Sequence, residues 1–374
     1  RAMLHADNCY FIPNIRIESH RLKTNTQSAT AYRGFGGPQG IVGIERVIDH
    51  LAHQLGLDPV TVMRRNLYAP MGSSPQTTPY GMSVEDSITD QILDRLIETS
   101  NYTARRQAVA EFNAKSPILK KGIALTPVKF GISFTLTWLN QAGALVHVYQ
   151  DGSIHLNHGG TEMGQGLFQK VAQVVAGVFA VDPAVVKITA TDTGKVPNTS
   201  ATAASSGSDL NGMAAKAAAE TIKARLAAFI ADKHGVPAAS VRFAKGEVRV
   251  AGEVYGFAQV VNWAYQARVS LSSTGFYATP KIVWDRVRGT GRPFLYFAYG
   301  AAVTEVVIDT LTGENRILRA DLLHDTGNSL NPALDIGQVE GAYVQGAGWL
   351  TTEELVWDAK GRLYVCCSPT YPQA

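Results

Sequence analysis

Apolar residues at helical spacing predict the helices of this chain. Between Ile41 and Leu55 they stand three and four positions apart, which places them on one face of a helix. The same spacing runs from Leu167 to Phe179. The segment from Met213 to Lys233 is rich in alanine, the strongest helix former, and Ser208 or Asp209 just before it is placed to cap a helix. We therefore predict a helix in each of these three segments.

Alternating apolar and polar residues predict two β-hairpins. The first has strands over 144–148 and 154–156, joined at Asp151-Gly152, a sequence typical of two-residue turns. The second has strands over 301–308 and 317–323. A polar glycine-containing loop and a helix follow each hairpin, and this repetition suggests an internal duplication. Strands and helices without a regular βαβ order predict an α+β fold.

Glycine- and serine-rich runs lie beside the predicted helices. The longest, His158–Gly166, has four glycines in nine residues, which permits positive φ and a close approach of the backbone to a ligand. A helix that begins directly after such a loop points free N–H groups towards it, an arrangement suited to an anion. Similar runs are Arg33–Gly37, Ala203–Ser208, Asp325–Ser329 and Asp335–Gly341. Several such runs on one chain predict one large cofactor held at several points.

Taken one at a time, these features have plainer explanations. A glycine-rich loop before a helix is more often a tight turn than a binding site. The carboxylates of Glu162 and Glu340 are expected to cap helical N–H groups. His158 has no metal-ligand spacing with the other histidines, which favours a structural role. By spacing alone, Phe35 and Phe134 are core residues.

Length and composition limit the remaining possibilities. A chain of 374 residues with 45% hydrophobic content can form two or three domains. Residues 68–79 are rich in proline, glycine, serine and threonine, and the charged stretch from there to Lys121 shows little periodicity. We interpret both as the connection between two domains, which occupy residues 1–115 and 116–374.

Charge and cysteine content exclude several classes of function. A net charge of +3 with dispersed lysine and arginine does not indicate nucleic-acid binding. The longest apolar stretch is far shorter than the ~20 residues of a membrane span. Three cysteines without metal-like spacing argue against a disulfide framework and iron–sulfur ligands, which favours the cytoplasm. No strand leads into a GxGxxG loop, which argues against a nicotinamide site.

Four motifs together resemble one family. TAYRGFGGPQG (30–40), KFGISFT (129–135), HGGTEMGQG (158–166) and SLNPALDIGQVEGAYVQG (329–346) are similar to the molybdopterin-binding part of the xanthine dehydrogenases, in the molybdenum hydroxylase family. The resemblance extends from Arg1 to about Leu363 and implies a piece of a longer protein. It identifies 1–115 as the last part of a first molybdenum-cofactor-binding domain with a linker, and 116–374 as a second such domain without its C-terminal end.

The resemblance implies a molybdenum–molybdopterin cofactor and the residues that hold it. In this family the metal is held through the dithiolene sulfurs of the cofactor, so no side chain of the chain is expected as a metal ligand. Arg33 would lie beside the molybdenum. Iron–sulfur clusters and FAD would be carried by other domains or subunits. The implied cofactor-binding residues are Arg33, Met163, Gly164, Gln165, Ala204, Ser205, Ser208 and Gln338.

The resemblance also implies a substrate site. Phe35 and Phe134 would sandwich a flat heteroaromatic ring, and Thr135 would hydrogen-bond to it. Arg1 would bind a purine carbonyl and stabilise the negative charge that develops on the ring. Read without the family, Arg1 is only an N-terminal charge.

The implied reaction is hydroxylation of a purine, from hypoxanthine or xanthine to urate, with oxygen derived from water. The family's general-base glutamate lies in a Gly-Glu-Pro-Pro motif that this chain does not contain, so we expect the chain alone to be inactive. Its expected partners are the remainder of the molybdenum subunit and the iron–sulfur and FAD parts, in an oligomer. Two alternatives are a non-catalytic phosphate- or nucleotide-binding module and a molybdenum hydroxylase for aldehydes or other N-heterocycles.

Overall fold

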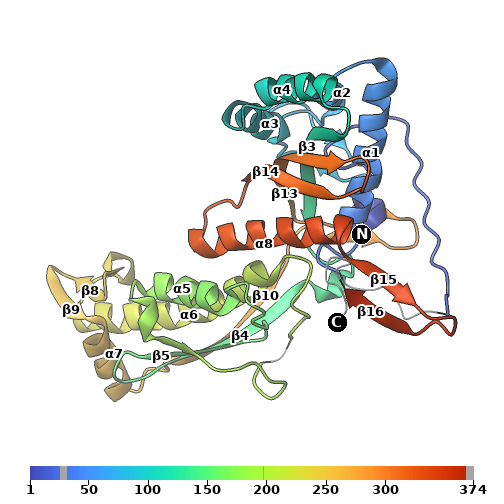
Figure 1. Cartoon of the computed structure of the whole chain (residues 1–374). Coiled ribbons are helices and arrows are strands. Elements are labelled where there is room, and N and C mark those ends of the chain that lie inside the picture. The colour runs from blue at the N-terminus through green and yellow to red at the C-terminus, as the bar shows by residue number, and fades with distance from the viewer. Residues whose placement is uncertain (26–31, 197, 368–374) are drawn as a thin grey trace, which may run out of the picture. The chain divides into compact units, whose positions relative to one another are not determined.

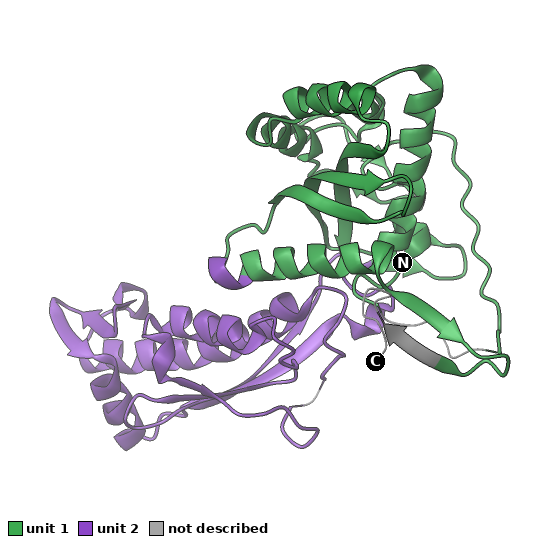
Figure 2. Ribbon diagram, in the orientation of Figure 1, with its two compact units in different colours: residues 1–132, 283–329, 335–374 green, residues 133–282, 330–334 purple. Residues whose placement is uncertain are grey.

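The computed structural model describes residues 1–25, 32–196 and 198–367. The first two residues of the TAYRGFGGPQG motif and the tail from Ser368 lie outside this part. The described residues form two compact units (Figure 2). Unit 1 comprises residues 1–132, 283–329 and 335–374, and unit 2 comprises residues 133–282 and 330–334.

A three-stranded antiparallel sheet forms the centre of unit 1 (Figure 1). Strand β13 (Tyr296–Asp309) lies between β3 (Leu119–Ile132) and β14 (Asn315–His324) and pairs with β3 along its whole length. The pairing with β14 is irregular between Glu305 and Val306. Strand β3 is therefore an edge strand, with one row of backbone groups turned away from β13.

Helices pack on this sheet around a core that includes Tyr10, Leu93 and Phe294. Arg105, on the fourth helix, forms ion pairs with Glu305 at 3.0 Å and Asp321 at 2.6 Å, which attach that helix to the two strands. The further elements of unit 1 are η1 (Ala2–His5), α1 (Gly37–Leu55), α2 (Pro59–Asn66), β1 (Gln76–Thr77), β2 (Ser83–Val84), α3 (Thr89–Thr99), α4 (Tyr102–Lys115), β11 (Val283–Asp285), β12 (Thr290–Arg292), most of α8 (Pro332–Thr351), β15 (Glu354–Trp357) and β16 (Leu363–Cys367).

Unit 2 is a four-stranded sheet with two long helices on one face (Figure 1). The strand order is β10-β4-β5-β6; β6 is parallel to β5 and the other pairs are antiparallel. The elements of unit 2 are η2 (Thr137–Leu139), β4 (Gln141–Val148), β5 (Ile154–His158), α5 (Leu167–Phe179), η3 (Pro183–Val185), β6 (Val186–Ile188), α6 (Gly207–Lys233), η4 (Ala238–Ser240), β7 (Arg242–Ala244), β8 (Glu247–Val250), β9 (Glu253–Gly256), α7 (Phe257–Gln266) and β10 (Ser272–Ala278).

Small residues let α6 lie directly on this sheet. Ala214 and Ala218 of α6 are fully buried and face Gly275 of β10. A Cβ atom at position 275 would lie 2.0 Å from the Ala214 carbonyl oxygen and 2.6 Å from the Ala218 nitrogen. The alanine-rich composition of α6 thus serves close helix–sheet packing as well as helix formation.

The structure confirms the predicted helices at α1, α5 and α6 and both predicted hairpins, β4–β5 and β13–β14. The predicted cap of α6 is wrong. The helix begins earlier than expected, its N-cap is Ser206, and Ser208 and Asp209 lie inside its first turn.

Two other expectations need correction. Residues 89–115, interpreted as part of a connection, form α3 and α4, because Ile92, Leu93 and Leu96 pack into the core of unit 1. The run 335–341, grouped by composition with the glycine-rich loops, lies inside α8; this confirms the helix expected after the second hairpin and corrects only the grouping. The two compact units follow tertiary contacts, such as the pairing of β3 with β13, and the boundary after residue 115 stays a prediction.

Candidate functional site

In unit 1 the loop Arg33–Gly37 has an unusual backbone. Gly34, Phe35 and Gly36 all have positive φ, at 86°, 52° and 92°. A Cβ atom at Gly36 would lie 3.2 Å from the Ala2 nitrogen and 3.8 Å from the Arg1 Cβ, so the loop packs against the chain segment at Arg1. The Phe35 side chain is 57% exposed. The plain interpretation of Phe35 as a core residue is therefore wrong, and its ring is open to a ligand.

Arg33 and Gln338 lie together in unit 1, although 305 residues separate them. Arg33 Nη2 donates to the Gln338 side-chain Oε1 at 2.9 Å and to its carbonyl oxygen at 3.2 Å. The neighbouring Tyr32 hydroxyl donates to the Gln345 carbonyl at 3.3 Å. Two of the predicted cofactor residues thus share one exposed surface, between the loop before α1 and the second turn of α8.

Arg1 is held against β3 by polar and aromatic contacts. Its Nη1 donates to the Gly131 carbonyl at 2.5 Å, and its guanidinium carbon lies 5.4 Å from the Phe130 ring centre and 4.9 Å from that of Phe294. Burial lowers the pKa of Arg1 to about 10, so the side chain keeps its charge at neutral pH. Arg1 is a fixed cation beside the loop that carries Phe35.

In unit 2 the glycine-rich loop uses its own carboxylate as a cap. Glu162 accepts hydrogen bonds from the N–H groups of Gly164, Gly166 and Phe168 at 2.9 to 3.0 Å, which confirms its predicted capping role. Partial burial alone would raise the pKa of Glu162, but these bonds outweigh it and lower the pKa. The glycine-rich loop was expected to offer these N–H groups to a bound anion. They bind the Glu162 carboxylate instead. Glu340 does not cap, because it lies well inside α8; Asn331 accepts from the Leu334 N–H instead.

The predicted cofactor residues of this loop remain on its surface. Met163 is 65% exposed, and no heavy atom lies within 4 Å of a Cβ built at Gly164. The Gln165 side chain accepts from the Met163 N–H at 2.6 Å and donates to the Thr161 carbonyl at 2.8 Å. The amide of Gln165 thus shapes the loop and leaves the side of Gly164 open.

His158, at the start of this loop, has a structural role. It is 3% exposed, and its Nδ1 accepts from the Gly160 N–H at 3.1 Å. Its ring meets Phe168 edge-on, with 5.1 Å between ring centres. Burial lowers the pKa of His158 to about 4, so the ring is neutral near pH 7. These contacts support the structural interpretation of His158, although its buried Nε2 has no hydrogen-bond partner among the described residues.

The serine-rich loop adjoins the glycine-rich loop, since the Thr161 N–H donates to the Thr202 hydroxyl at 2.8 Å. Ala204 and Ser205 have positive φ, at 60° and 57°, a conformation rare for non-glycine residues and frequent at ligand sites. α6 follows without a side-chain hydrogen bond at its N-cap. Ser208 lines a hollow of about 520 Å³ that side chains of α5 and α6 also line.

Phe134 and Thr135 follow the end of β3 and belong to unit 2. The Asn140 side chain forms two hydrogen bonds with the Phe134 backbone. Its Oδ1 accepts from the Phe134 N–H at 2.7 Å, and its Nδ2 donates to the Phe134 carbonyl at 2.8 Å. Phe134 and Thr135 are half-buried, and Phe134 packs on the core of unit 2. A ring sandwiched between Phe35 and Phe134 stays a prediction, since the two residues belong to different units.

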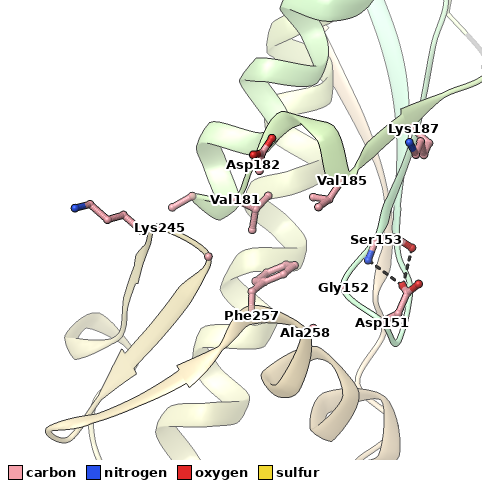
Figure 3. A pocket seen from close by; sticks show the side chains of 12 residues that line it. Asp151, Gly152, Ser153, Val181, Asp182, Val185, Lys187, Lys245, Phe257 and Ala258 are labelled. Carbon is pink, nitrogen blue, oxygen red and sulfur yellow. Dashed lines mark hydrogen bonds between the residues drawn. The ribbon is translucent and has the colours of Figure 1, made fainter.

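A larger hollow, of about 640 Å³, lies beyond the C-terminal end of α5 (Figure 3). Its two carboxylates are engaged in local turns: Asp151 accepts from the Ser153 N–H and hydroxyl, and Asp182 accepts from the Ala184 N–H. None of the predicted site residues lines this hollow. In the described part of the chain, no three histidine, cysteine or acidic side chains are grouped as a metal site, and no helix has the length and apolarity to cross a membrane.

Sequence reasoning missed a buried polar cluster between the first ten residues and β3. Asn8 donates to the Pro127 carbonyl at 2.8 Å and accepts from the Lys129 N–H at 2.9 Å, so it binds the free edge of β3. Lys129 Nζ lies 3.3 Å from Asp7 Oδ2, and each side chain is 1% exposed. Tyr68 donates to the same carboxylate at 2.8 Å. The available signal was the group of polar residues His5, Asp7 and Asn8 near the start of the chain, but their partners depend on the fold.

Comparisons with known proteins identify the family of these elements. Two family models, both described as a molybdopterin cofactor-binding domain, match residues 1–67 and 95–371. The chain is 44% identical over 374 residues to a xanthine dehydrogenase of Dictyostelium discoideum and 45% identical over 371 residues to a xanthine dehydrogenase/oxidase of Mus musculus. Each match covers 99% of this chain and 26% of the relative. The chain thus spans about a quarter of the length of the curated relatives it matches.

Solved structures share the fold. Quinoline 2-oxidoreductase from Pseudomonas putida 86 superposes with a TM-score of 0.79 at 26% identity, over 92% of this chain and 44% of that chain. Reconstituted CO dehydrogenase from Oligotropha carboxidovorans gives a TM-score of 0.75 at 21% identity, over 88% of this chain and 42% of that chain. The mixed helix and strand architecture confirms the predicted α+β class.

Proposed function

The chain belongs to the family of molybdopterin cofactor-binding domains, and we propose that, within a longer protein, it supplies cofactor- and substrate-binding residues to a purine-oxidising molybdenum hydroxylase. The observation that carries the substrate proposal is the fixed cation at Arg1, beside the exposed ring of Phe35. The high identity to xanthine dehydrogenases over nearly the whole chain supports the same substrate class.

The exposed groups of each unit fit a large, polar and anionic cofactor. Gly164 has open space where a side chain would stand, and the successive positive-φ residues Ala204 and Ser205 precede a helix start without a side-chain cap. On unit 1, Arg33 and Gln338 present a cation and an amide on one surface. Several separate binding groups of this kind suit a pterin with a phosphate group better than a simple anion.

We assign the holding of the cofactor to a small set of side chains and backbone groups. Arg33 and Gln338 would bind it from unit 1. The bound group supplies a molybdenum centre that accepts the electrons taken from the substrate. Those assigned from unit 2 are Met163, Gly164, Gln165, Ala204, Ser205 and Ser208.

Arg1 favours a ring substrate that carries a carbonyl group. Its charge is kept at neutral pH, and its position is fixed by Gly131 and two aromatic rings. A fixed cation binds a carbonyl oxygen and stabilises negative charge as it develops there. Phe35 can stack on the flat ring, and we assign Phe134 and Thr135 to the same substrate. An aldehyde has neither a ring carbonyl nor a delocalised ring charge for Arg1 to stabilise, so it gains less from this residue.

Oxidation of the substrate also needs a general base. The chain contains no Gly-Glu-Pro-Pro motif, and we assign the base to the remainder of the longer protein. Iron–sulfur and FAD domains or subunits would receive the electrons. We therefore propose that the chain alone binds but does not turn over a purine.

The test uses the full-length protein, purified from a host that makes the cofactor. Arg1→Met removes the charge and keeps an unbranched side chain. We expect kcat/KM for xanthine to fall by about a hundredfold or more, because one charged contact in the transition state is lost, while kcat/KM for an aromatic aldehyde changes little. An equal fall for both substrates, with unchanged cofactor content, would contradict the purine assignment.

A further inference from the structure

His5 is fully buried, and its two ring nitrogens have different partners. Nε2 lies 3.0 Å from the Gly131 nitrogen, and Nδ1 lies 2.9 Å from the Arg1 carbonyl oxygen. The Gly131 N–H can only donate, so Nε2 accepts. Nδ1 then carries the ring proton and donates to Arg1, because a carbonyl oxygen can only accept. The two contacts together fix the tautomer of the ring.

Arg1, His5 and Gly131 form a closed set of hydrogen bonds. The Arg1 side chain donates to the Gly131 carbonyl, and its own carbonyl accepts from His5, which in turn accepts from the Gly131 N–H. The Leu4 N–H also donates to the Arg1 carbonyl, at 3.0 Å. Both ends of Arg1, its main chain and its guanidinium, are therefore fixed to one residue of the β3 edge.

Two aromatic rings enclose this set. The His5 ring stacks on Phe130, with 4.6 Å between ring centres and 27° between planes, and lies 5.4 Å from the Phe294 ring. The Arg1 guanidinium lies over the same two rings. There is no space for a side chain at position 131, since a Cβ atom there would lie 2.3 Å from the Phe294 ring. The imidazole has one orientation available to it.

The charge state of His5 suits this arrangement. Burial lowers its pKa to about 3; the hydrogen bond to Arg1 raises it, and the positive charges of Lys129 and Arg1 lower it again. The ring is therefore neutral near pH 7. A protonated ring would lose its acceptor for Gly131 and repel Arg1.

We propose that His5 is the positioning residue for Arg1, the cation that we assign to the substrate. The His5 Nδ1–H donates to the Arg1 carbonyl and thereby fixes the position of the Arg1 guanidinium. The inference rests on the proposed role of Arg1 in purine binding. His5 is closed off from solvent and does not touch the substrate; it acts through Arg1 alone.

Two substitutions separate the two hydrogen bonds of His5. Asparagine places its amide nitrogen near the position of Nδ1, so His5→Asn keeps the donor to Arg1 and loses the acceptor for Gly131. Glutamine places its amide oxygen near the position of Nε2, so His5→Gln keeps the acceptor and loses the donor. Both leave a gap where the ring stacked on Phe130, and each is therefore the control for the other.

The experiment compares these variants in the full-length, cofactor-loaded protein with xanthine and with an aromatic aldehyde. We expect His5→Gln to lower kcat/KM for xanthine about tenfold, as for one lost hydrogen bond, and to leave the aldehyde reaction nearly unchanged. His5→Asn should retain most of the xanthine activity. In an Arg1→Met background, His5→Gln should cause no further loss, because its effect passes through Arg1.

Other outcomes overturn the inference. Equal losses in His5→Gln and His5→Asn, equal losses for both substrates, or a full additional loss in the Arg1→Met background would each mean that His5 only stabilises the fold. If His5→Gln does not accumulate as folded protein, His5→Asn decides alone: a xanthine-specific loss as large as that of Arg1→Met contradicts the inference. Failure of the proposed function can be told apart from failure of this inference. In that case Arg1→Met itself would change kcat/KM for xanthine and for the aldehyde by the same factor.

Discussion

Arg33 Nη2 donates to Gln338 Oε1 at 2.9 Å, so that the loop before α1 and the second turn of α8 present one continuous polar surface. Both residues were assigned to the cofactor from separate motifs, and they are exposed or half-buried. A cation paired with an amide, rather than with a carboxylate, keeps its charge available to an anionic ligand. Gln338 therefore holds the Arg33 guanidinium in place without neutralising its charge.

This relationship predicts that Gln338→Ala reduces cofactor retention. The substitution removes an amide assigned to the cofactor and the shorter of the two hydrogen bonds that Arg33 makes to this residue, so we expect the molybdenum content of the purified full-length protein to fall several-fold. Glu340→Ala, on the same helix and exposed, is the control and should leave the content unchanged. Equal molybdenum content in both variants would contradict the assignment.

Close packing of α6 on β10 predicts a large effect at Gly275. Gly275→Ala would place a Cβ 2.0 Å from the Ala214 carbonyl oxygen, and overpacking of this kind costs about 1–3 kcal/mol. Gly177→Ala, in α5 and with no atom within 4 Å of the new Cβ, should instead be neutral or stabilise the helix by up to about 1 kcal/mol. Thermal unfolding, with hydrogen exchange of α6 and β10, measures both effects. A Gly275→Ala protein as stable as wild type would contradict the packing.

The Glu162 cap predicts a stability difference that depends on pH. Hydrogen bonds from the loop hold the folded-state pKa of Glu162 below its usual value of 4.5, despite partial burial. The stabilisation is thus complete well above pH 4.5 and is lost as pH falls through the lower, folded-state pKa. Glu162→Gln should lower the melting temperature at neutral pH, and the difference from wild type should shrink on acidification. A constant difference at all pH values would exclude the charge as the cause.

The buried pair Asp7–Lys129 predicts strong coupling. Asp7→Asn leaves the Lys129 ammonium buried without a counter-charge, which costs about 3–5 kcal/mol. Replacing both by apolar residues, in Asp7→Leu/Lys129→Met, should recover much of that loss. The exposed pair Arg95–Glu98 is the control, and Glu98→Gln should change stability by less than about 1 kcal/mol. Denaturant unfolding of wild type and the three variants tests the coupling; a double variant no more stable than Asp7→Asn would refute it.

The local sequence pattern was sufficient to predict helices that bury one face. α5 carries Leu167, Val171 and Val175 on a single buried side, and its period is visible in the sequence. α4 buries only Tyr102 and Val109, and its ion pairs from Arg105 reach strands some two hundred residues away. Nothing local identifies a helix such as α4. α3 does carry a local signal, since Ile92, Leu93 and Leu96 stand at helical spacing and are buried, and the interpretation of this stretch as a connection overlooked it.

The site was predictable only in part, for a related reason. The resemblance of motifs selected Arg33 and Gln338, and the fold brings them together. It gave no role to His5 or Asn8, whose partners are backbone groups on the free edge of β3. Side chains that replace a neighbouring strand have no periodic signature, because their partners are fixed by tertiary structure alone.

The most direct test of the central claim is elemental molybdenum and pterin analysis of the full-length protein from a host that makes the cofactor. We predict near one molybdenum and one pterin per chain in the wild type, and a clear loss of both when Gln338→Ala is combined with Ser205→Pro, which alters the loop before α6. Wild-type protein without molybdenum or pterin, but with tight binding of a nucleotide, would contradict cofactor binding and identify the loops as a phosphate-binding module.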